Sequence, residues 1–345
     1  MKIFYVGMEY DHYDPRRGKS FEYTNFYLSL AALPNAEVVN FSFDKILTVG
    51  RKAFNKELLE EVKKQKPDIV FVFMYSDELD PTTLKELKKY TTTIAWFADD
   101  SWRFYNYSKF WAKHFTWAIT TYSWMPELYR KAGQPNVIRS QWAMNSTIYK
   151  PTKAEHGAQV SFVGGKTPSR ETIIKNLHEN GIDIEAFGTG WSKGRISEEK
   201  MIEVFSNSKI NLALNPPPGR WTRNAIGRLL LRPSLNTVAL DLHLISNFKT
   251  FAHQNIRQIK ARHFEIPACG GSVLTVAADD IENYYVPDKE IVLYKDDNEL
   301  LEKIHYYLQH EEERARIAKA AYERTVRDHT YEKRFAEIFK TVGLK

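Results

Sequence analysis

The sequence predicts an α/β protein of two tandem domains, each with a parallel, doubly wound sheet of the Rossmann-like type. Strand-like and helix-like stretches alternate along the first half, stop in the polar stretch Lys153–Gly157, and then start again. The run Asp68–Phe73 is apolar after its first residue, as expected for a strand covered on both faces. Because 345 residues is the length of two average domains, we expect domains at 1–150 and 151–345.

The first domain is expected to alternate strands with helices that end at prolines. Ser20 suits the N-cap of the first helix, and Pro34 and Pro67 stop the first two. Its strands are expected at Lys2–Val6, Glu37–Phe43, Asp68–Phe73, Thr92–Phe97, Trp117–Thr121 and Asn136–Ser140, and its helices at Ser20–Leu33, Asn55–Lys66 and Asp80–Tyr90.

The second domain repeats the alternation and ends in a helical tail. Its strands are expected at Gln159–Val163, Asp183–Phe187, Ile210–Leu214, Ser272–Thr275 and Ile291–Tyr294. Its helices are expected at Ser169–Asn180, Glu198–Ser206, Phe264–Ala268, Asn298–Gln309, Glu311–Arg327 and Tyr331–Lys340. Parallel sheets bind ligands beyond the carboxyl ends of their strands, so we expect the site there.

Composition excludes several classes of protein. The single cysteine, Cys269, rules out an internal disulfide framework and a multi-cysteine zinc site. No apolar run approaches the ~20 residues of a membrane span, and the N-terminus shows no signal-peptide pattern. We therefore expect a cytoplasmic protein.

The net charge of +6 comes from one segment. Between Pro216 and Arg262 there are eight Lys and Arg residues and one acid, Asp241, so this segment carries +7 and the rest of the chain −1. Such a patch favours an anionic partner, which includes nucleotide phosphates, nucleic acid and an anionic surface.

Two glycine-rich turns follow strands of the second domain. Gly164 and Gly165 precede Lys166 and a helix that carries Arg170, an arrangement in which backbone N–H groups and cations can hold a phosphate. The second turn, Phe187–Trp191, includes Gly188 and Trp191 and is placed to lie against a base or a sugar. Each turn is also compatible with a plain connection between a strand and a helix.

The segment Ile259–Gly271 holds the strongest pair of candidate residues. Arg262 and Glu265 lie three residues apart on one helix face. A guanidinium can hold a diphosphate and a carboxylate can accept both ribose hydroxyls, although a surface ion pair would have the same spacing.

These motifs resemble the nucleotide-sugar half of the CgeB-like (spore maturation protein) glycosyltransferases, which are related to the group 1 GT-B glycosyltransferases. The resemblance is carried by FVGGKTPSR, FGTGW, SKINL and FEIPACGG, continues to His329–Tyr331, and is looser in the first half at WFADD and GKSFEY. It implies a GT-B fold, with two facing Rossmann-like domains and a C-terminal helical tail.

The resemblance also implies roles for single residues. Glu265 matches the glutamate that binds the ribose, Arg262 a diphosphate contact, and Gly164 and Gly165 the turn beside the phosphates. Group 1 enzymes often carry another glutamate eight positions earlier, where this chain has Arg257. The implied donor is a nucleotide sugar, a UDP-sugar by expectation, used without a cofactor and without a metal site at Asp99–Asp100.

Three carboxylates of the first domain are candidates for the general base. Asp100 is the first candidate, Asp99 the second and Glu22 the third, because a base must take the proton of an acceptor hydroxyl. A helix cap before Trp102 is the competing interpretation for Asp99 and Asp100.

The basic insert, residues 216–255, is the largest departure from the family pattern. Its side chains Arg220, Trp221, Arg223, Arg228 and Arg232 suit contact with an anionic acceptor, either DNA or a phosphorylated or lipid-linked molecule. A helical hairpin with solvated basic faces is the structural alternative.

The leading hypothesis is therefore an enzyme that moves a sugar from a nucleotide sugar to an acceptor hydroxyl. One alternative makes the acceptor a hydroxymethylated base in phage-type DNA. The other is a non-catalytic nucleotide-binding or nucleic-acid-binding protein, although no helix-turn-helix, RRM or zinc-finger signature is present in the sequence.

Overall fold

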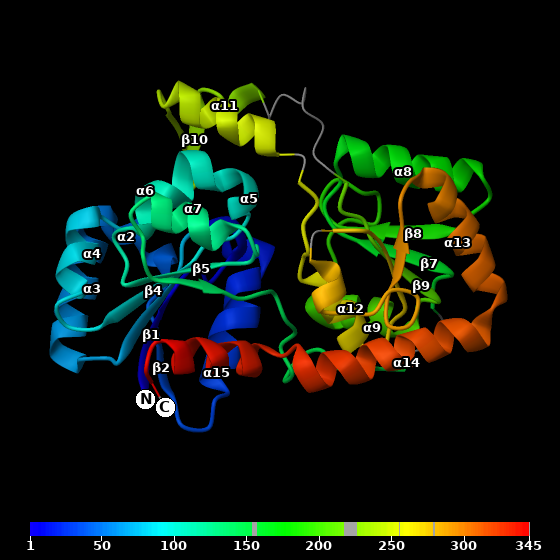
Figure 1. Ribbon diagram of the computed structural model, residues 1–345, viewed down its shortest axis with the longest axis horizontal. Coiled ribbons are helices and arrows are strands. Elements are labelled where there is room, and N and C mark those ends of the chain that lie inside the picture. The colour runs from blue at the N-terminus through cyan, green and yellow to red at the C-terminus, as the bar shows by residue number, and fades with distance from the viewer. Residues whose placement is uncertain (154–156, 217–225, 255, 279, 345) are drawn as a thin grey trace. The chain divides into compact units, whose positions relative to one another are not determined.

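The computed structural model divides the chain into two compact units, and each is discontinuous in sequence (Figure 1). The first unit comprises Met1–Gln141, Arg220–Gln254 and Arg334–Lys345, and the second comprises Trp142–Gly219 and Asn255–Lys333. The structure describes residues 1–153, 157–216, 226–254, 256–278 and 280–344. The insert and the chain end, both expected in the second domain, are thus grouped with the first unit.

The first unit is built on a six-stranded parallel sheet of order β2-β1-β3-β4-β5-β6. All five residues of β3 are buried, as the apolar run Asp68–Phe73 predicts for a covered central strand. The strands are β1 (Lys2–Val6), β2 (Glu37–Asn40), β3 (Ile69–Phe73), β4 (Thr92–Trp96), β5 (Trp117–Thr120) and β6 (Val137–Arg139). The helices are η3 (Tyr23–Tyr27, a π-helix), α1 (Leu28–Ala31), α2 (Ile46–Val49), α3 (Arg51–Gln65), α4 (Pro81–Leu87), α5 (Asp100–Arg103), η5 (Phe104–Ser108, a π-helix), α6 (Lys109–Ala112) and α7 (Met125–Lys131).

Aromatic side chains fill the core of this unit. The Phe26 ring meets those of Phe73 and Trp96 edge-on, each at a centroid distance of 4.9 Å. Phe335 of the last helix, α15 (Tyr331–Thr341), lies 5.7 Å from Phe71. This packing explains why the chain end belongs to the first unit.

The insert forms an antiparallel hairpin and a helix, and it is held to the first unit by Asp77. The hairpin pairs β10 (Leu231–Ser234) with β11 (Thr237–Leu240), and α11 (Leu244–His253) follows. Asp77 contacts Arg232 at 2.9 Å and accepts a hydrogen bond from the Ser234 hydroxyl at 2.9 Å. The helical hairpin that we considered for the insert is therefore wrong, because Leu231–Leu240 pairs as strands.

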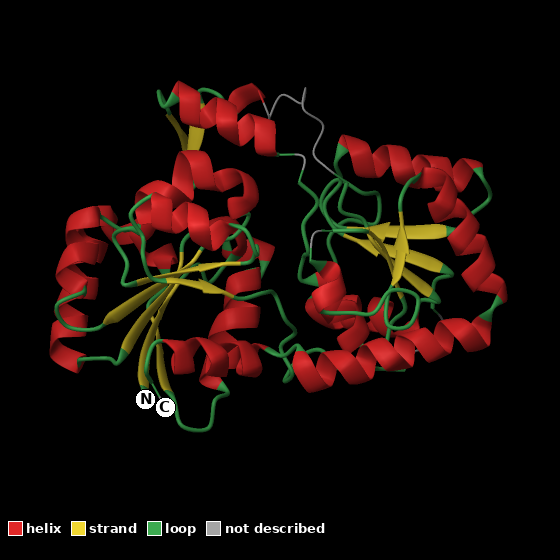
Figure 2. Cartoon of the chain, viewed as in Figure 1, coloured by secondary structure: helices red, strands yellow, loops and turns green. Residues whose placement is uncertain are grey.

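The second unit has a five-stranded parallel sheet of order β13-β12-β9-β7-β8. Helices cover both faces of the sheet in each unit (Figure 2), so the predicted fold class is confirmed. The strands are β7 (Val160–Val163), β8 (Ile184–Phe187), β9 (Ile210–Ala213), β12 (Val273–Val276) and β13 (Val292–Tyr294). The helices are α8 (Pro168–Glu179), α9 (Glu198–Asn207), α12 (Arg262–Ala268), α13 (Asp297–Gln309) and α14 (Glu311–Asp328).

Candidate active site

The two glycine turns of the second unit interlock at the carboxyl ends of β7 and β8. The Gly164 amide donates to the Phe187 carbonyl at 2.9 Å, and the Trp191 indole N–H donates to the Gly164 carbonyl at 2.9 Å. Gly188 has a φ of 128°, and a Cβ there would lie 2.4 Å from the Gly164 oxygen. Only glycine fits this position, so the predicted turns are one structure rather than two separate loops.

Arginine side chains bring positive charge to this edge. Arg170 of α8 donates to the Gly165 carbonyl at 2.8 Å and to the Leu214 carbonyl at 3.2 Å. Burial lowers the pKa of Arg170, and the positive charge of Arg262 lowers it further. The mutual repulsion of the two guanidinium groups would be relieved by an anion at this edge.

Lys166 is placed differently from Arg170. Its ammonium pairs with Glu171 at 2.7 Å and lies 5.5 Å from the centre of the Trp191 ring. The cation therefore stays beside the glycine turns, where it is only partly exposed.

Glu265 is a fully buried carboxylate at this edge. Its exposed fraction is 0%, and its Oε2 forms an ion pair with Arg262, which lies one turn earlier on α12. Burial opposes the charge of Arg262, but the Glu265 carboxylate holds the pKa of Arg262 above its ordinary value. Within the described part of the chain, Glu265 Oε1 has no hydrogen-bond partner. A buried acceptor of this kind is costly when it is left unbonded, so it suits a hydroxyl donor from a ligand.

A second carboxylate beside Glu265 was missed by the sequence analysis. Burial raises the pKa of Glu198 to about 7, and the neighbouring Glu265 charge adds to this rise. Tyr149 donates its hydroxyl to Glu198 at 3.3 Å. Glu198 was interpreted only as the start of the helix Glu198–Ser206, because nothing local in the sequence shows that Glu265 lies close.

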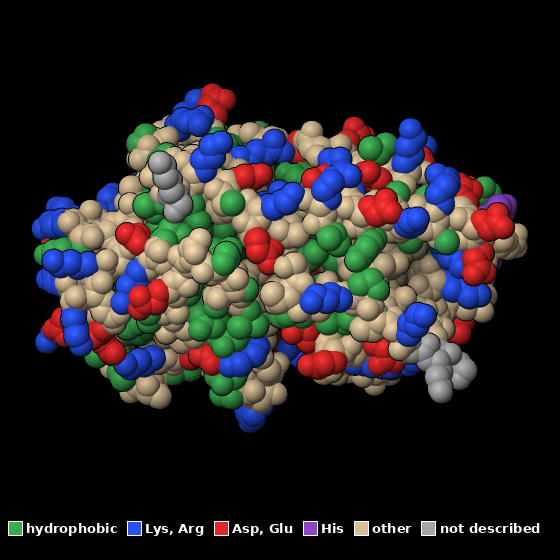
Figure 3. All heavy atoms as spheres, turned by 90° about the horizontal axis from the view of Figure 1, so that it is seen from below, with side chains coloured by type: hydrophobic (Ala, Val, Ile, Leu, Met, Phe, Trp, Pro, Cys, Tyr) green, Lys and Arg blue, Asp and Glu red, His purple; other side chains and the backbone are tan. Residues whose placement is uncertain are grey.

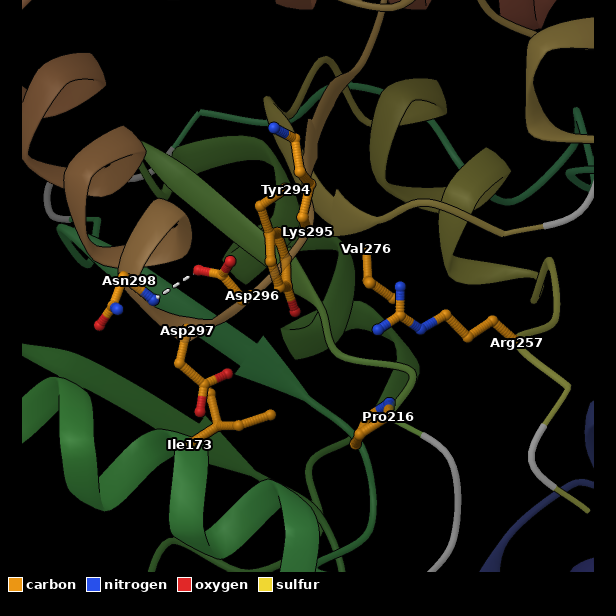
Figure 4. A pocket seen from close by; sticks show the side chains of 9 residues that line it. All are labelled: Ile173, Pro216, Arg257, Val276, Tyr294, Lys295, Asp296, Asp297 and Asn298. Carbon is orange, nitrogen blue, oxygen red and sulfur yellow. Dashed lines mark hydrogen bonds between the residues drawn. The ribbon is translucent and has the colours of Figure 1, made fainter.

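A cavity of about 470 Å³ opens at the carboxyl ends of β9, β12 and β13 (Figure 4). Arg257 reaches into it beside Val276, opposite the carboxylates of Asp296 and Asp297. Asp296 caps α13 by accepting from the Asn298 amide at 3.0 Å. Arg257, where the resemblance leads one to expect a glutamate, thus gives this cavity a positive side chain.

In the first unit, Asp100 is completely buried. Its Oδ2 accepts the Tyr129 hydroxyl at 2.9 Å, and its exposed fraction is 0%. Burial raises the pKa of Asp100 to about 7. Like Glu265 Oε1, Asp100 Oδ1 has no hydrogen-bond partner within the described residues, so the base role of Asp100 stays a prediction.

Asp99 precedes α5 with a left-handed φ of 57°, and its side chain makes no cap hydrogen bond to the helix. The capping interpretation therefore does not hold for the side chain of Asp99. It lines a small cavity of about 210 Å³, together with Tyr75, Trp102 and Arg103.

Glu22 lies in the first turn of the helix that follows Ser20 and is partly exposed, and the Tyr5 hydroxyl of β1 donates to its backbone carbonyl at 3.0 Å. Desolvation raises the pKa of Glu22 to about 7, and the nearby charges of Asp11 and Glu78 contribute. The Ser20 hydroxyl accepts from the Tyr23 amide at 3.0 Å, which confirms Ser20 as the cap that begins this helix.

Glu78 differs from Glu22 because its carboxylate is fully bonded. It accepts from the Tyr13 hydroxyl at 2.7 Å and from the Ser76 amide at 2.8 Å, and it is wholly buried. This carboxylate fixes the loop after β3, whereas Glu22 and Asp11 are partly exposed.

The arginines of the insert that the structure describes are engaged inside the first unit. Arg228 lies over the Trp102 ring at 4.5 Å, and Arg232 is paired with Asp77. The other three predicted contacts, Arg220, Trp221 and Arg223, lie outside the described residues.

Neither a metal site nor a membrane span is found in the described part of the chain. No group of three or more His, Cys, Asp or Glu side chains there is placed to hold a metal ion. Likewise, no helix among these residues is both long and apolar enough to cross a bilayer.

Comparison with known proteins identifies the fold of this chain. Residues 169–340 match the family described as "Glycosyl transferase-like". The fold is similar to sucrose-phosphate synthase (tll1590) from Thermosynechococcus elongatus, with a TM-score of 0.62 and 12% identity over 99% of this chain and 98% of that one. It is also similar to Anabaena Alr3699/HepE in complex with UDP-glucose, with a TM-score of 0.61 and 11% identity over 99% of both chains. The chain therefore has the GT-B fold of glycosyltransferases.

One relative is similar in sequence over nearly the whole chain. The chain is 23% identical over 354 residues to Spore protein CgeB from Bacillus subtilis (strain 168), covering 98% of each protein. It is thus a distant full-length homologue of that protein, and the predicted resemblance to the CgeB-like glycosyltransferases is confirmed.

Proposed function

We propose that the protein transfers a sugar from a nucleoside diphosphate sugar, UDP-sugars first, to an acceptor hydroxyl. The second unit holds the donor. The observation that carries this proposal is the buried Glu265 carboxylate, which pairs with Arg262 and keeps one oxygen unbonded within the described residues. Ribose hydroxyls supply the donors that this oxygen lacks, and Arg262 with Arg170 and the glycine turns suits a diphosphate.

The structural neighbour bound to UDP-glucose supports the choice of nucleotide. In this chain the cavity with Arg257 lies at the same sheet's carboxyl edge and has room for a nucleoside or a sugar, at about 470 Å³. Catalysis needs no group beyond these residues and the base in this proposal.

Glu22 is the proposed general base. It is partly exposed, and its pKa near 7 suits a group that takes a proton from a hydroxyl at neutral pH. Asp100 instead has a structural part in this proposal, because Tyr129 and the surrounding core cover it.

The donor assignment is tested by calorimetry with UDP and UDP-glucose. Glu265→Gln and Arg262→Ala should each weaken UDP binding at least tenfold without unfolding the protein. The matched control is Glu179→Gln, at an exposed carboxylate on α8 of the same unit. Unchanged UDP affinity in both site variants would refute the donor site. Transfer of the sugar is measured separately with radiolabelled UDP-glucose.

A further inference from the structure

Helix α11 of the insert exposes its apolar side and buries its polar side. Asn247 and Thr250 are 1% and 0% exposed, whereas Leu244, Ile245 and Phe248 are 56%, 78% and 65% exposed. This is the reverse of an ordinary surface helix, which turns its apolar stripe to the core.

Hydrogen bonds fix this orientation. Asn106 of η5 donates its amide to Asn247 at 3.0 Å, and Lys109 of α6 donates to the Ser246 hydroxyl at 3.0 Å. Asn247 donates in turn to the Leu229 carbonyl at 3.0 Å. Rotation of α11 to hide its apolar side would break all three bonds, so the exposed face is part of the folded first unit.

The hairpin extends the apolar surface. Val238, Leu240 and Leu242 are 67%, 64% and 72% exposed. A shallow cavity of about 610 Å³ lies beside α11 and is lined by Ile226, Leu229, Leu230, Leu244, Ile245, Phe248 and Lys249. We call the apolar lining residues, with Val238, Leu240 and Leu242, the apolar patch. An exposed apolar surface such as the lining of this cavity marks an interaction site.

The charges around the apolar patch are positive. Lys249 lies in its lining, and burial together with the Lys249 charge lowers the pKa of the neighbouring Lys109. The one carboxylate between Pro216 and Asn255, Asp241, is 3% exposed and is bonded to His243. By contrast, acidic and basic side chains are interspersed over the face drawn in Figure 3.

An apolar surface edged by cations, without an exposed acid in its own segment, matches one occupant best. Leu, Ile and Phe enter the acyl boundary of a bilayer while lysines meet anionic headgroups. A second copy of the chain would bring like charges together, and nucleic acid offers phosphates but no partner for so many aliphatic side chains. We propose that the apolar patch docks this protein on an anionic lipid surface.

The test is flotation with vesicles of phosphatidylcholine alone or with 30% phosphatidylglycerol. The full chain should float with the anionic vesicles, and the double variant Ile245→Glu, Phe248→Glu should lose at least tenfold in partition. The matched control adds the same two charges at Leu47 and Val49, which are 44% and 41% exposed in the same unit, and should bind like the wild type. Lys249→Glu should weaken binding to anionic vesicles only.

Other occupants give different outcomes. A dimer in sedimentation velocity that the double variant dissociates, without flotation of the wild type, would assign the patch to a second copy and overturn the proposal. Duplex binding in a gel shift that the double variant abolishes, again without flotation, would assign it to nucleic acid. UDP affinity should stay unchanged in the double variant, because docking does not rest on the donor site.

Discussion

The buried carboxylates at the carboxyl edges of the two sheets have different partners and different pKa shifts. In the second unit, Glu265 is buried in an ion pair with Arg262. The Glu265 carboxylate holds the pKa of Arg262 above its ordinary value. In the first unit, Asp100 is buried against a hydroxyl and Glu22 is desolvated, and the pKa of each rises to about 7. An ion pair keeps charge available for binding, whereas desolvation leaves a carboxyl ready to exchange a proton at neutral pH. At the second edge the paired Glu265 favours binding, although burial also raises the pKa of Glu198 beside it to about 7. At the first edge the raised pKa values of Asp100 and Glu22 favour proton transfer.

The largest expected effect comes from Glu22→Gln, which removes the proposed base. We expect turnover to fall by about 10²–10⁴-fold while UDP affinity stays the same. The wild-type rate should rise with pH through about 7, since the base acts when it is deprotonated, and the variant should lack this limb. The measurement is initial rate from pH 5 to 9.

Glu57→Gln, an exposed carboxylate of the same unit, serves as the control and should behave like the wild type. If Glu22→Gln turns over at the wild-type rate, the base lies elsewhere, and Asp99→Asn becomes the variant to measure.

Asp100→Asn tests the buried carboxylate of the first edge through the pH dependence of the unfolding free energy. The raised pKa of Asp100 means that its protonated form favours the fold. This contribution is complete below about pH 4, and it is lost as the pH rises through about 7. Because the group is fully buried, the wild type should lose on the order of a few kcal/mol between pH 5 and 8 that the variant keeps. Urea unfolding at these two pH values measures it, and parallel curves for both proteins would contradict the assigned cause.

Gly188→Ala tests the second edge at the backbone. A Cβ 2.4 Å from the Gly164 oxygen, at a φ of 128°, forces the glycine turns apart. We expect a loss of about 1–3 kcal/mol in unfolding free energy together with weaker UDP binding. Gly181→Ala is the control, since Gly181 also has a positive φ but has no atom within 4 Å of the place that a Cβ would take. It should keep UDP affinity, and equal UDP affinity in both variants would separate the turns from the donor site.

The sequence predicted the second edge better than the first for a physical reason. The strands of both sheets and the helices that we expected could be located within a few residues because periodicity and proline stops are local. The helices at 100–112 and 125–131, the hairpin and α11 were not predicted. Arg262 and Glu265 could be paired because they share one helix turn. Glu198 escaped notice since its neighbour Glu265 is distant in sequence, and burial of Asp100 depends on Tyr129 from another helix.

The insert shows the same limit. The charge of the insert could be read from the sequence. The hydrogen bond between Arg232 and Asp77 could not be predicted, because these residues lie more than 150 positions apart. The exposed side of α11 could not be predicted either, because an apolar stripe ordinarily implies burial. The net charge of the insert led us to expect arginines on its surface. Over the described residues, the exposed side chains are instead largely aliphatic.

The smallest expected effect concerns the attachment of the insert. Asp77 is 6% exposed and is bonded to Ser234, with Arg51 and Arg232 at 3.2 and 2.9 Å. Asp77→Asn keeps a partner for the hydroxyl but removes the charge that both arginines face. Since these arginines are partly exposed, the local loss should be about 1 kcal/mol, enough to speed chymotrypsin cleavage within 226–254 about fivefold. Asp80→Asn, three residues away, is the control and should be cleaved like the wild type. Unchanged UDP affinity with faster cleavage would show that the insert and the donor edge are separate parts of the molecule, whereas a joint loss would show that the two regions are coupled.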